Sequence, residues 1–495
     1  MSFAKIYTRG LLGLHAPQIE VEVHISSGLP SLTIVGLPEA AVRESKDRVR
    51  SAIINSGFLF PTKRLTINLA PADLPKDGSR LDLPIALGIL IASGQLPENC
   101  TDGFEFIGEL ALDGHLRPVS GTLTIAMACQ QARHRLLLPT ANLDEASQLP
   151  EFEVYAASHL QQVCAHFLGS SPLKAAPQKS MAASSRYPFD LADVKGQLRP
   201  RRALEIAAAG GHSLLFKGPP GTGKTLLASR LPSILPPLNA QENLEVASIY
   251  SVANAQHTFG QRPFRAPHHT ASAIALVGGG SQPKPGEITL AHLGVLFLDE
   301  LPEFDRKVLE VLRQPLESKE IVISRAARQM TFPANFQFIA AMNPCPCGYA
   351  FNQDSRCQCS PESIQRYQNR ISGPLLDRID LHIDVPPLQA NELQERTPSE
   401  NSETVRQRVM KAYQQQIQRQ QCLNQALSPT LLEQYACLDD SSSKIIEMAQ
   451  QRLNLSARAY HRVLRVARTI ADLAESEIIS SSHLTEALSY RGHST

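Results

Sequence analysis

Residues 213–230 read SLLFKGPPGTGKTLLASR, and this stretch decides the fold. The apolar run SLLF predicts a buried strand, and the segment TLLASRL predicts the start of a helix. Between them, GPPGTGKT matches the phosphate-loop spacing G-x-x-x-x-G-K-[ST]. The backbone N–H groups of such a loop wrap a phosphate, and the helix N-terminus adds its partial positive charge. The stretch therefore predicts a binding site for a nucleoside triphosphate; the alternative is a chance Gly/Pro turn before a helix.

The candidate nucleotide ligands follow from this match. Lys224 is expected to reach the β- and γ-phosphates, and the Thr225 hydroxyl is expected to bind Mg²⁺. The rest of the loop is expected to surround the phosphates with its backbone, and consists of Gly218, Pro219, Pro220, Gly221, Thr222 and Gly223.

Two later apolar strands are expected to deliver polar side chains to the same place. GVLFLDE (294–300) ends in Asp299, expected to hold Mg²⁺ through water, and Glu300, expected to polarise the attacking water as general base. FQFIAAMNP (336–344) ends near Asn343, which is placed to hydrogen-bond the γ-phosphate or the attacking water. An apolar strand ending in Asp-Glu is a weak signal alone, but beside a phosphate loop it becomes specific.

Length and composition bound the class of protein. The 495 residues suggest about three domains. A net charge of +1 neither requires nor excludes nucleic acid, because a basic channel can be offset by acidic surfaces elsewhere. We expect no signal peptide, and the longest apolar run, Leu83–Ala92, is too short to cross a bilayer. Nine cysteines are read as reduced thiols plus a metal site in a cytosolic protein.

Changes in composition predict the domain boundaries. The stretch GSSPLKAAPQKSMAASSRYP is rich in Ser, Ala and Pro and has a linker composition. The chain is helical in pattern after a second stretch of this kind. The expected organisation is an α/β domain over 1–170, a linker over 171–188, a nucleotide-binding core over 189–385, a linker over 386–403 and a helical lid over 404–495.

The N-terminal domain resembles the C-terminal domain of Lon-type proteases (a ribosomal S5 domain 2-like fold) in PADLPKDG (71–78) and a hairpin over 106–121. That family uses a Ser–Lys dyad, but Arg80 occupies the serine position and the helix after the hairpin lacks lysine. We therefore expect a degenerate, non-proteolytic domain with Ser79 as a helix cap. A basic cluster is either a binding surface or a solvated face; it contains Lys76, Arg80 and Arg117.

Four cysteines cluster within a polar loop after Asn343. They are Cys345, Cys347, Cys357 and Cys359, and the pattern favours a tetrahedral structural Zn²⁺ site. The C-x-C spacing is less common than C-x-x-C, and the alternative is four reduced surface thiols. A closed site of this kind would staple the loop and take no part in catalysis.

Two insertions flank the GVLFLDE strand. The first (262–294) carries His268 and His269, for which a packed or hydrogen-bonding role is expected because no further metal ligand accompanies them. It also carries Lys284 in a glycine-rich loop. The second (313–339) predicts a β-hairpin with Arg325 and Arg328 near its tip.

The segment ISGPLLDRIDLHID (371–384) resembles the arginine-finger box of Mg-chelatase and MCM helicases. The resemblance implies that Arg378 acts in trans, projecting into the ATP site of a neighbouring subunit; Arg370 is the second candidate. The alternative is that Arg378 pairs with Asp377 or Asp380 on its own surface.

The C-terminal part ends with a basic amphipathic helix, LSARAYHRVLRVARTIADLAES (455–476). In AAA+ proteins a sensor-2 arginine lies on such a lid helix, and Arg458 stands at that position.

Taken together, DVKGQ, GPPGTGKT, RPFRAPHHTAS, AHLGVLFLDELPEF, MNPCPCG and SARAYHRVLRVARTIADL resemble the ComM family almost end to end. This family is also called the YifB or Mg-chelatase-like family of bacterial AAA+ proteins. The resemblance implies an α/β fold: an AAA+ P-loop core with a helical lid, preceded by the Lon-like domain. It implies a cytoplasmic homo-hexameric ring, without membrane contact, that uses ATP and Mg²⁺ to drive DNA branch migration in natural transformation.

In that family the insertions point into the central pore, so the DNA-contact candidates are Lys284, Arg325 and Arg328. Two other interpretations stay open. One is a chelatase motor that drives Mg²⁺ insertion into a porphyrin, and the other is a protein-remodelling or proteolytic ATPase of Lon type. The missing Ser–Lys dyad argues against the second.

Overall fold

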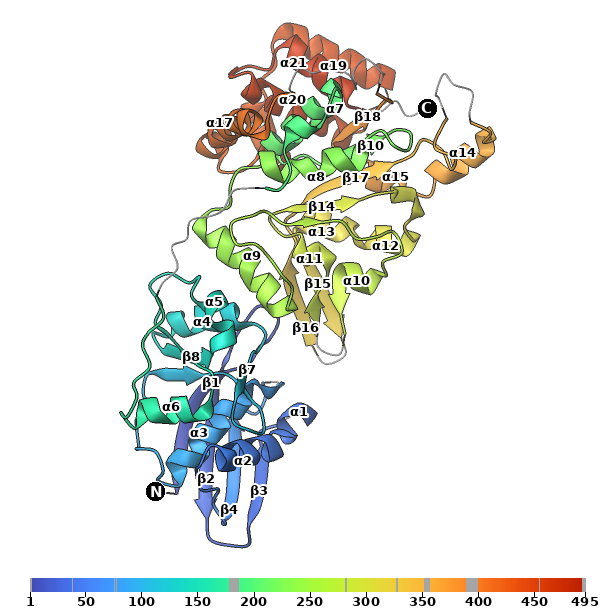
Figure 1. Cartoon of the computed structure of the whole chain (residues 1–495). Coiled ribbons are helices and arrows are strands. Elements are labelled where there is room, and N and C mark those ends of the chain that lie inside the picture. The colour runs from blue at the N-terminus through green and yellow to red at the C-terminus, as the bar shows by residue number, and fades with distance from the viewer. Residues whose placement is uncertain are drawn as a thin grey trace. The chain divides into compact units, whose positions relative to one another are not determined.

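The computed structural model describes residues 2–37, 39–74, 76, 78–177, 187–280, 283–325, 328–350, 357–388, 399–453 and 455–491. The chain forms two compact units, which Figure 1 shows as one ribbon. The N-terminal unit comprises Met1–Ala182 and Leu244–His257, and the C-terminal unit comprises Ala183–Asn243 and Thr258–Thr495. Residues 244–257, which follow the phosphate loop in sequence, therefore pack with the N-terminal unit.

The N-terminal unit is built on a seven-stranded sheet with the order β3-β4-β2-β1-β5-β8-β9. β1, β2 and β4 pair antiparallel, and the remaining neighbours pair parallel. Buried and exposed side chains alternate along β2, as the period of a half-buried strand requires. The strands are β1 (Phe3–Arg9), β2 (Gln18–Ser26), β3 (Ser31–Val35), β4 (Arg64–Ala70), β5 (Phe104–Phe106), β8 (Arg135–Pro139) and β9 (Val154–Ala157).

Helix α3 (Asp82–Ala92) is the centre of this unit's core. All eleven of its residues are buried, and it packs against β1 and β2 (Figure 1). The apolar run noted in the sequence is therefore a core helix. The other helices are α1 (Ala40–Arg43), α2 (Ser45–Asn55), α4 (Thr122–Gln131), α5 (Leu143–Ala146) and α6 (Leu160–Phe167), and β6 (Glu109–Leu110) and β7 (Leu116–Arg117) form the expected hairpin.

A buried carboxylate ties the middle strands of this sheet together. Glu105 on β5 accepts hydrogen bonds from Arg9 Nε (2.6 Å) and Nη2 (2.7 Å), Cys129 Sγ (3.0 Å) and His134 Nδ1 (2.8 Å). Burial raises the pKa of Glu105, but the hydrogen bonds from Arg9, Cys129 and His134 outweigh it, so the pKa is lowered. The ionised carboxylate is the form that this cluster stabilises.

Two expectations for the N-terminal domain are wrong. Gly78, not Ser79, caps the short 3₁₀ helix Ser79–Leu81, because the Ser79 hydroxyl donates to the Glu109 carboxylate instead. Lys76 and Arg80 do not form a basic surface, since Lys76 is fully buried with its ammonium bonded to the Pro71 carbonyl and Arg80 is also buried.

The C-terminal unit is built on a five-stranded parallel sheet with the order β11-β14-β17-β10-β18. Its strands are β11 (Phe264–Arg265), β14 (Val295–Leu298), β17 (Gln337–Met342), β10 (Leu214–Lys217) and β18 (Leu381–Asp384). β14 is buried at every position, as expected for a strand covered on both faces. The predicted α/β fold class is confirmed.

Helices and small hairpins surround this sheet. The helices are α7 (Leu198–Gly210), α8 (Lys224–Ile234), α10 (Ala273–Val277), α11 (Glu287–Leu290), α12 (Arg306–Val311), α13 (Arg313–Ser318), α14 (Pro361–Gln368) and α15 (Gly373–Leu376). Helix α9 (Ala240–Ala253) starts in this unit, but its residues from Leu244 onward belong to the N-terminal unit. The hairpins are β12 (Gly278–Gly279) with β13 (Lys284–Pro285) and β15 (Glu320–Arg325) with β16 (Arg328–Pro333).

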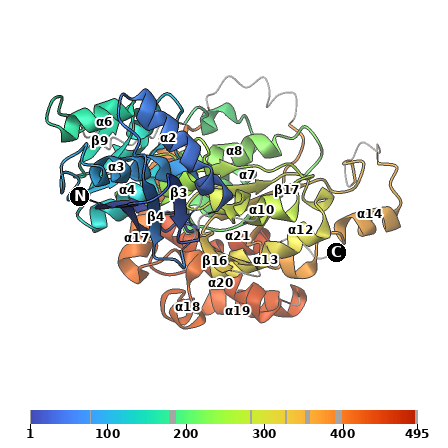
Figure 2. The same ribbon diagram turned by 90° about the horizontal axis from the view of Figure 1, so that it is seen from below.

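The last helices gather into one group in both views (Figures 1 and 2). They are α17 (Ser402–Gln420), α18 (Pro429–Tyr435), α19 (Asp440–Leu453), α20 (Ala457–Leu473) and α21 (Ser481–Ser489). We call them the helical group. The predicted amphipathic helix is α20, whose apolar face is buried.

A buried polar chain joins the helical group to the parallel sheet. Thr469 on α20 lies 2.8 Å from His212 Nε2, and His212 Nδ1 lies 3.5 Å from the Asp380 carboxylate. Asp380 accepts from the Ser213 backbone N–H (3.1 Å) at the start of β10. Burial opposes ionisation of Asp380, but His212 and Arg462 hold its pKa at about 2. These hydrogen bonds and ion pairs therefore connect α20 to Ser213 and Asp380, the residues that immediately precede β10 and β18.

Replacing Glu105 by Ala leaves Arg9 buried without its carboxylate. We expect a loss of about 3–5 kcal/mol of stability, measured by urea denaturation with hydrogen exchange on β1 and β5. Because the pKa of Glu105 is lowered, its contribution is present above the unfolded-state pKa and is lost as pH falls through the folded-state pKa. Glu20→Ala, which breaks the partly exposed Lys5–Glu20 pair, is the control and should cost about 0–1 kcal/mol. Equal losses in the two variants would contradict this account.

Candidate nucleotide-binding site and cysteine cluster

The predicted phosphate loop lies between β10 and α8, and Lys224 is the first residue of α8. Gly223 before it has a φ of 87°, a left-handed conformation that glycine adopts without strain. At Gly218 a Cβ would lie 2.3 Å from the Val385 carbonyl oxygen, so only glycine fits there. Both glycines of the motif therefore stand where a residue with a Cβ would be strained or would clash.

Lys224 is buried inside this loop. Its Nζ donates to the carbonyl oxygens of Gly218 (2.7 Å) and Pro219 (2.8 Å) and to Asn343 Oδ1 (3.1 Å). Burial lowers the pKa of Lys224, and the charges of Asp299 and Glu300 oppose that effect. The structure thus brings the expected lysine and the expected asparagine into contact.

The acidic strand end lies beside them because β17 is the only strand between β10 and β14. Thr225 Oγ1 donates to Asp299 Oδ2 at 2.6 Å, and Asp299 Oδ1 accepts from the Glu300 backbone N–H at 2.9 Å. A hydroxyl and a carboxylate in contact at this place are the oxygen donors that Mg²⁺ prefers. These residues fit a Mg²⁺–nucleotide complex.

One neighbour of Glu300 was missed by sequence reasoning. His269 Nδ1 lies 3.2 Å from Glu300 Oε2, and the rings of His268 and His269 are 4.1 Å apart. The sequence predicts a hydrogen-bonding role for this pair but gives no signal for its partner. His269 follows β11 and Glu300 follows β14, and the two residues meet because these strands are neighbours in the sheet.

The arginine candidates are engaged within the chain. Arg378 pairs with Glu317 on α13 and donates to the Pro374 carbonyl oxygen (2.7 Å), whereas the expected alternative partners were Asp377 and Asp380. Arg370 pairs with Glu303 at 2.8 Å and its side chain is 55% exposed, against 14% for Arg378.

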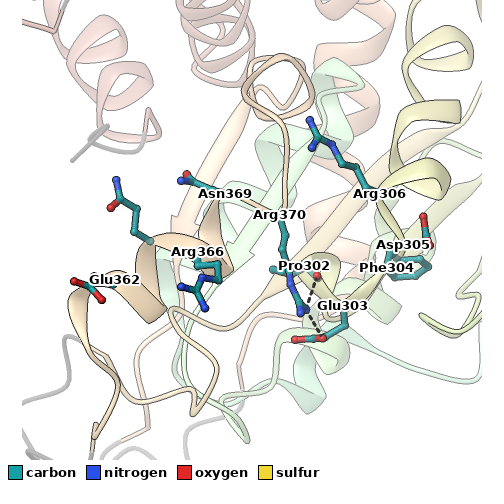
Figure 3. A pocket seen from close by; sticks show the side chains of 10 residues that line it. Pro302, Glu303, Phe304, Asp305, Arg306, Glu362, Arg366, Asn369 and Arg370 are labelled. Carbon is teal, nitrogen blue, oxygen red and sulfur yellow. Dashed lines mark hydrogen bonds and ion pairs between the residues drawn. The ribbon is translucent and has the colours of Figure 1, made fainter.

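Arg370 borders a pocket of about 800 Å³ between α12 and α14 (Figure 3). The pocket mixes cationic and anionic side chains, and is lined by Pro302, Glu303, Phe304, Asp305, Arg306, Glu362, Gln365, Arg366, Asn369 and Arg370.

Of the remaining candidates, Arg458 and Lys284 are exposed. Arg458 is exposed in the first turn of α20. Lys284 is exposed on β13. Arg325 and Arg328 are the pair that closes the β15–β16 hairpin, and their side chains fall outside the described residues. The hairpin itself is confirmed.

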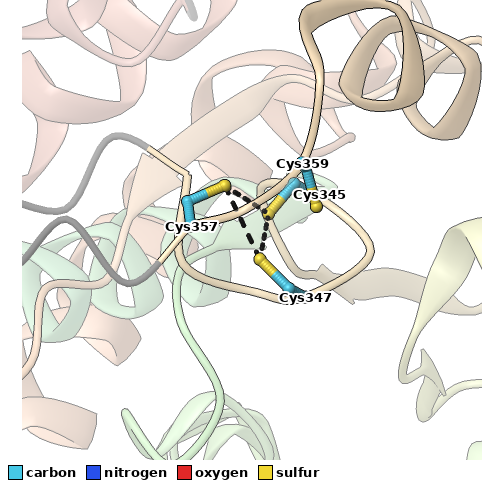
Figure 4. Close-up of side chains that lie close together, drawn as sticks. All are labelled: Cys345, Cys347, Cys357 and Cys359. Carbon is cyan, nitrogen blue, oxygen red and sulfur yellow. Dashed lines mark hydrogen bonds between the residues drawn. The ribbon is translucent and has the colours of Figure 1, made fainter.

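The four clustered cysteines converge. Their sulfur atoms all lie within 4.8 Å of one another (Figure 4). The shortest separations are 3.3 Å for Cys345–Cys347 and 3.6 Å for Cys347–Cys357. The Tyr349 backbone N–H, together with Cys345, lowers the pKa of the Cys347 thiol to about 6. The donor set and its compactness fit a tetrahedral thiophilic metal such as Zn²⁺. None of the nine cysteines forms a disulfide.

A phosphate loop after β10, an acid pair after β14 and a polar residue after β17 define a P-loop ATPase fold of the AAA+ class. Comparison with known proteins supports this class. Residues 21–142 match the family described as subunit ChlI of Mg-chelatase. Residues 190–393 match the family described as magnesium chelatase, subunit ChlI, and residues 399–491 match its C-terminal family.

The competence protein ComM of Haemophilus influenzae is 50% identical, covering 99% of this chain and 98% of that protein. The Escherichia coli protein YifB is also 50% identical, covering 99% and 97%. The magnesium-chelatase 38 kDa subunit of Rhodobacter capsulatus is 22% identical over 62% of this chain and 89% of its own length. The chain belongs to the Mg-chelatase-like AAA+ family that includes ComM and YifB.

A search of the described helices for membrane-crossing segments finds none that is long and apolar enough.

Replacing Lys224 by Ala removes the only side-chain ammonium inside the phosphate loop. We expect nucleotide affinity to fall at least about a hundredfold, since a buried charge contact to phosphate is lost. Binding of a fluorescent ATP analogue with Mg²⁺ measures the change. Lys284→Ala, which removes an exposed lysine from β13, should leave nucleotide affinity at the wild-type value. Normal binding by Lys224→Ala would refute the assignment of this loop.

Proposed function

We propose that this chain is the subunit of a hexameric, ATP-driven DNA motor that promotes branch migration during natural transformation. The convergence of Lys224, Thr225, Asp299 and Asn343 at one edge of the parallel sheet carries the ATPase part of the proposal. The DNA part is supported by the full-length similarity to a competence protein and by the exposed Lys284 on β13.

The phosphate loop binds the nucleotide in this proposal. Backbone N–H groups from Gly221 to Thr225 would donate to the β- and γ-phosphates, and Lys224 would turn from the loop carbonyls to a γ-phosphate oxygen. Thr225 and Asp299 are the residues that would hold Mg²⁺. Bound there, the ion would neutralise charge that develops on the phosphate oxygens.

Glu300 accepts a proton from the attacking water, and Asn343 orients that water or the γ-phosphate. Both side chains stand at the ends of adjacent parallel strands, so their separation is set by the sheet. Glu300 has a φ of 52°, a left-handed conformation that is uncommon outside glycine. Such strain concentrates at functional sites and is consistent with a catalytic role.

A ring of subunits is part of the proposal because Arg378 would act at the nucleotide site of a neighbouring subunit. In this proposal its pair with Glu317 opens when a neighbouring subunit docks, and the guanidinium then stabilises charge on that subunit's γ-phosphate. Arginine fingers contribute a factor of about 10³–10⁵ in rate. Arg370, which is more exposed, is the second candidate. Arg458 is proposed to contact the nucleotide from the helical lid, residues 404–495.

DNA contacts are assigned to Lys284 and to the β15–β16 hairpin, which carries Arg325 and Arg328. Basic side chains bind DNA phosphates without regard to sequence, and such binding weakens with salt. The four-cysteine cluster is proposed to hold a structural Zn²⁺, and the reduced cysteines are consistent with a cytoplasmic protein.

A chelatase motor is the second candidate, because a magnesium-chelatase subunit aligns with 62% of this chain. Such a motor need not respond to DNA. DNA-dependent ATP turnover therefore separates the two functions.

The Glu300→Gln variant keeps the shape of the side chain but cannot accept a proton. We expect it to bind ATP with wild-type affinity and to hydrolyse it about 10²–10⁴ times more slowly. Single-turnover hydrolysis and analogue binding on the same preparation separate the two effects. Wild-type turnover would remove Glu300 from the role of base.

The DNA motor itself is tested by ATP turnover with and without single-stranded and forked DNA across a salt series. We expect stimulation that fades as salt rises, and a weaker salt dependence for Lys284→Ala because one phosphate contact is lost. Turnover that is indifferent to DNA at every salt concentration would favour the chelatase motor.

A further inference from the structure

The loop that carries the four cysteines packs directly on the phosphate loop. We call residues 345–350 and 357–359 the cysteine loop. Gly348 in this loop has a φ of 87°, and a Cβ added there would lie 2.6 Å from Cδ of Pro220 and 3.2 Å from its Cγ. No side chain fits in that gap. The third residue of the phosphate loop is thus in van der Waals contact with the backbone of the cysteine loop.

The same loop continues directly from the strand end that contacts Lys224. Asn343 accepts the hydrogen bond from Lys224 (3.1 Å) and lies two residues before Cys345. Pro344 between them accepts from Gln368 Nε2 on α14 at 3.0 Å. The cysteine loop therefore meets the nucleotide site at two points, Pro220 and Asn343.

The four cysteines bring the two ends of this loop together, one near the end of β17 and the other near the start of α14. Cys345 is fully buried and its sulfur accepts the Ala350 N–H at 3.2 Å. Cys357 and Cys359 come from the other end of the loop, just before α14. A metal bound by all four sulfurs would join the end of β17 to the start of α14. It would fix the turn that contains Gly348.

We propose that the metal-bound cysteine loop is a positioning element for the phosphate loop, so that loss of the metal weakens nucleotide binding. The proposal rests on the proposed Zn²⁺ site and adds a function to it. Binding sites need their ligands held to within about 0.5 Å, which a supporting contact provides. The supporting contact is the one between Gly348 and Pro220. A metal bound by the four sulfurs holds Gly348 in position for it.

The first test removes the metal. Cys357→Ser should lose its bound zinc and bind a fluorescent ATP analogue about tenfold more weakly, with far-UV circular dichroism unchanged. Cys437→Ser removes an exposed cysteine from the helical group and should keep both zinc and affinity. Chelation of the wild-type protein should weaken binding similarly, and added Zn²⁺ should restore it.

The second test removes the contact and keeps the metal. Gly348→Ala should retain one zinc per chain and bind the analogue about tenfold more weakly, because its Cβ meets Pro220. Gly94→Ala is matched to it: Gly94 has a φ of 76°, and a Cβ there has no heavy atom within 4 Å. It carries the same backbone strain without the contact, so its affinity should stay at the wild-type value.

Wild-type affinity in zinc-free Cys357→Ser, or in Gly348→Ala, would overturn the positioning role. Reduced wild-type protein that binds no zinc would overturn the metal site and with it the proposal. Neither result bears on the ATP site, which Lys224→Ala tests separately.

Discussion

A buried ammonium that lacks a carboxylate contact is the constraint on which the C-terminal unit depends. Lys224 is 8% exposed, and its contacts among the described residues are two loop carbonyls and one amide oxygen. A charge costs free energy when it leaves water, and burial lowers the pKa of this lysine although the charges of Asp299 and Glu300 oppose that shift. An anionic phosphate in contact with this ammonium would offset that cost.

The parallel sheet places the other candidate nucleotide-binding residues beside Lys224. Strands β10, β17 and β14 are adjacent, and the residues that follow them meet at one edge although they lie far apart in sequence. The buried chain from Thr469 through His212 to Asp380 ties the helical group to the same strands. These contacts join the helical group to the residues that immediately precede β10 and β18.

Sequence patterns predicted the parts of this architecture that depend on local rules. The phosphate-loop match, the buried strands and the cysteine cluster have fixed spacings or periodicities, and the structure shows the expected strands and brings the four cysteines together. Contacts between distant segments were not found. His269 beside Glu300, Glu317 beside Arg378 and Gly348 against Pro220 depend on tertiary packing. Lys76 was expected at the surface because charge predicts exposure, yet its stem and ammonium are enclosed by the fold.

The central claim is that ATP hydrolysis at this site moves DNA junctions. The most direct measurement is branch migration of a synthetic three-stranded or four-way junction by the purified full-length protein, with the Glu300→Gln variant run in parallel. The account predicts migration that requires hydrolysable ATP and is absent in the variant. ATP hydrolysis by the wild-type protein without any movement of the junction would contradict it.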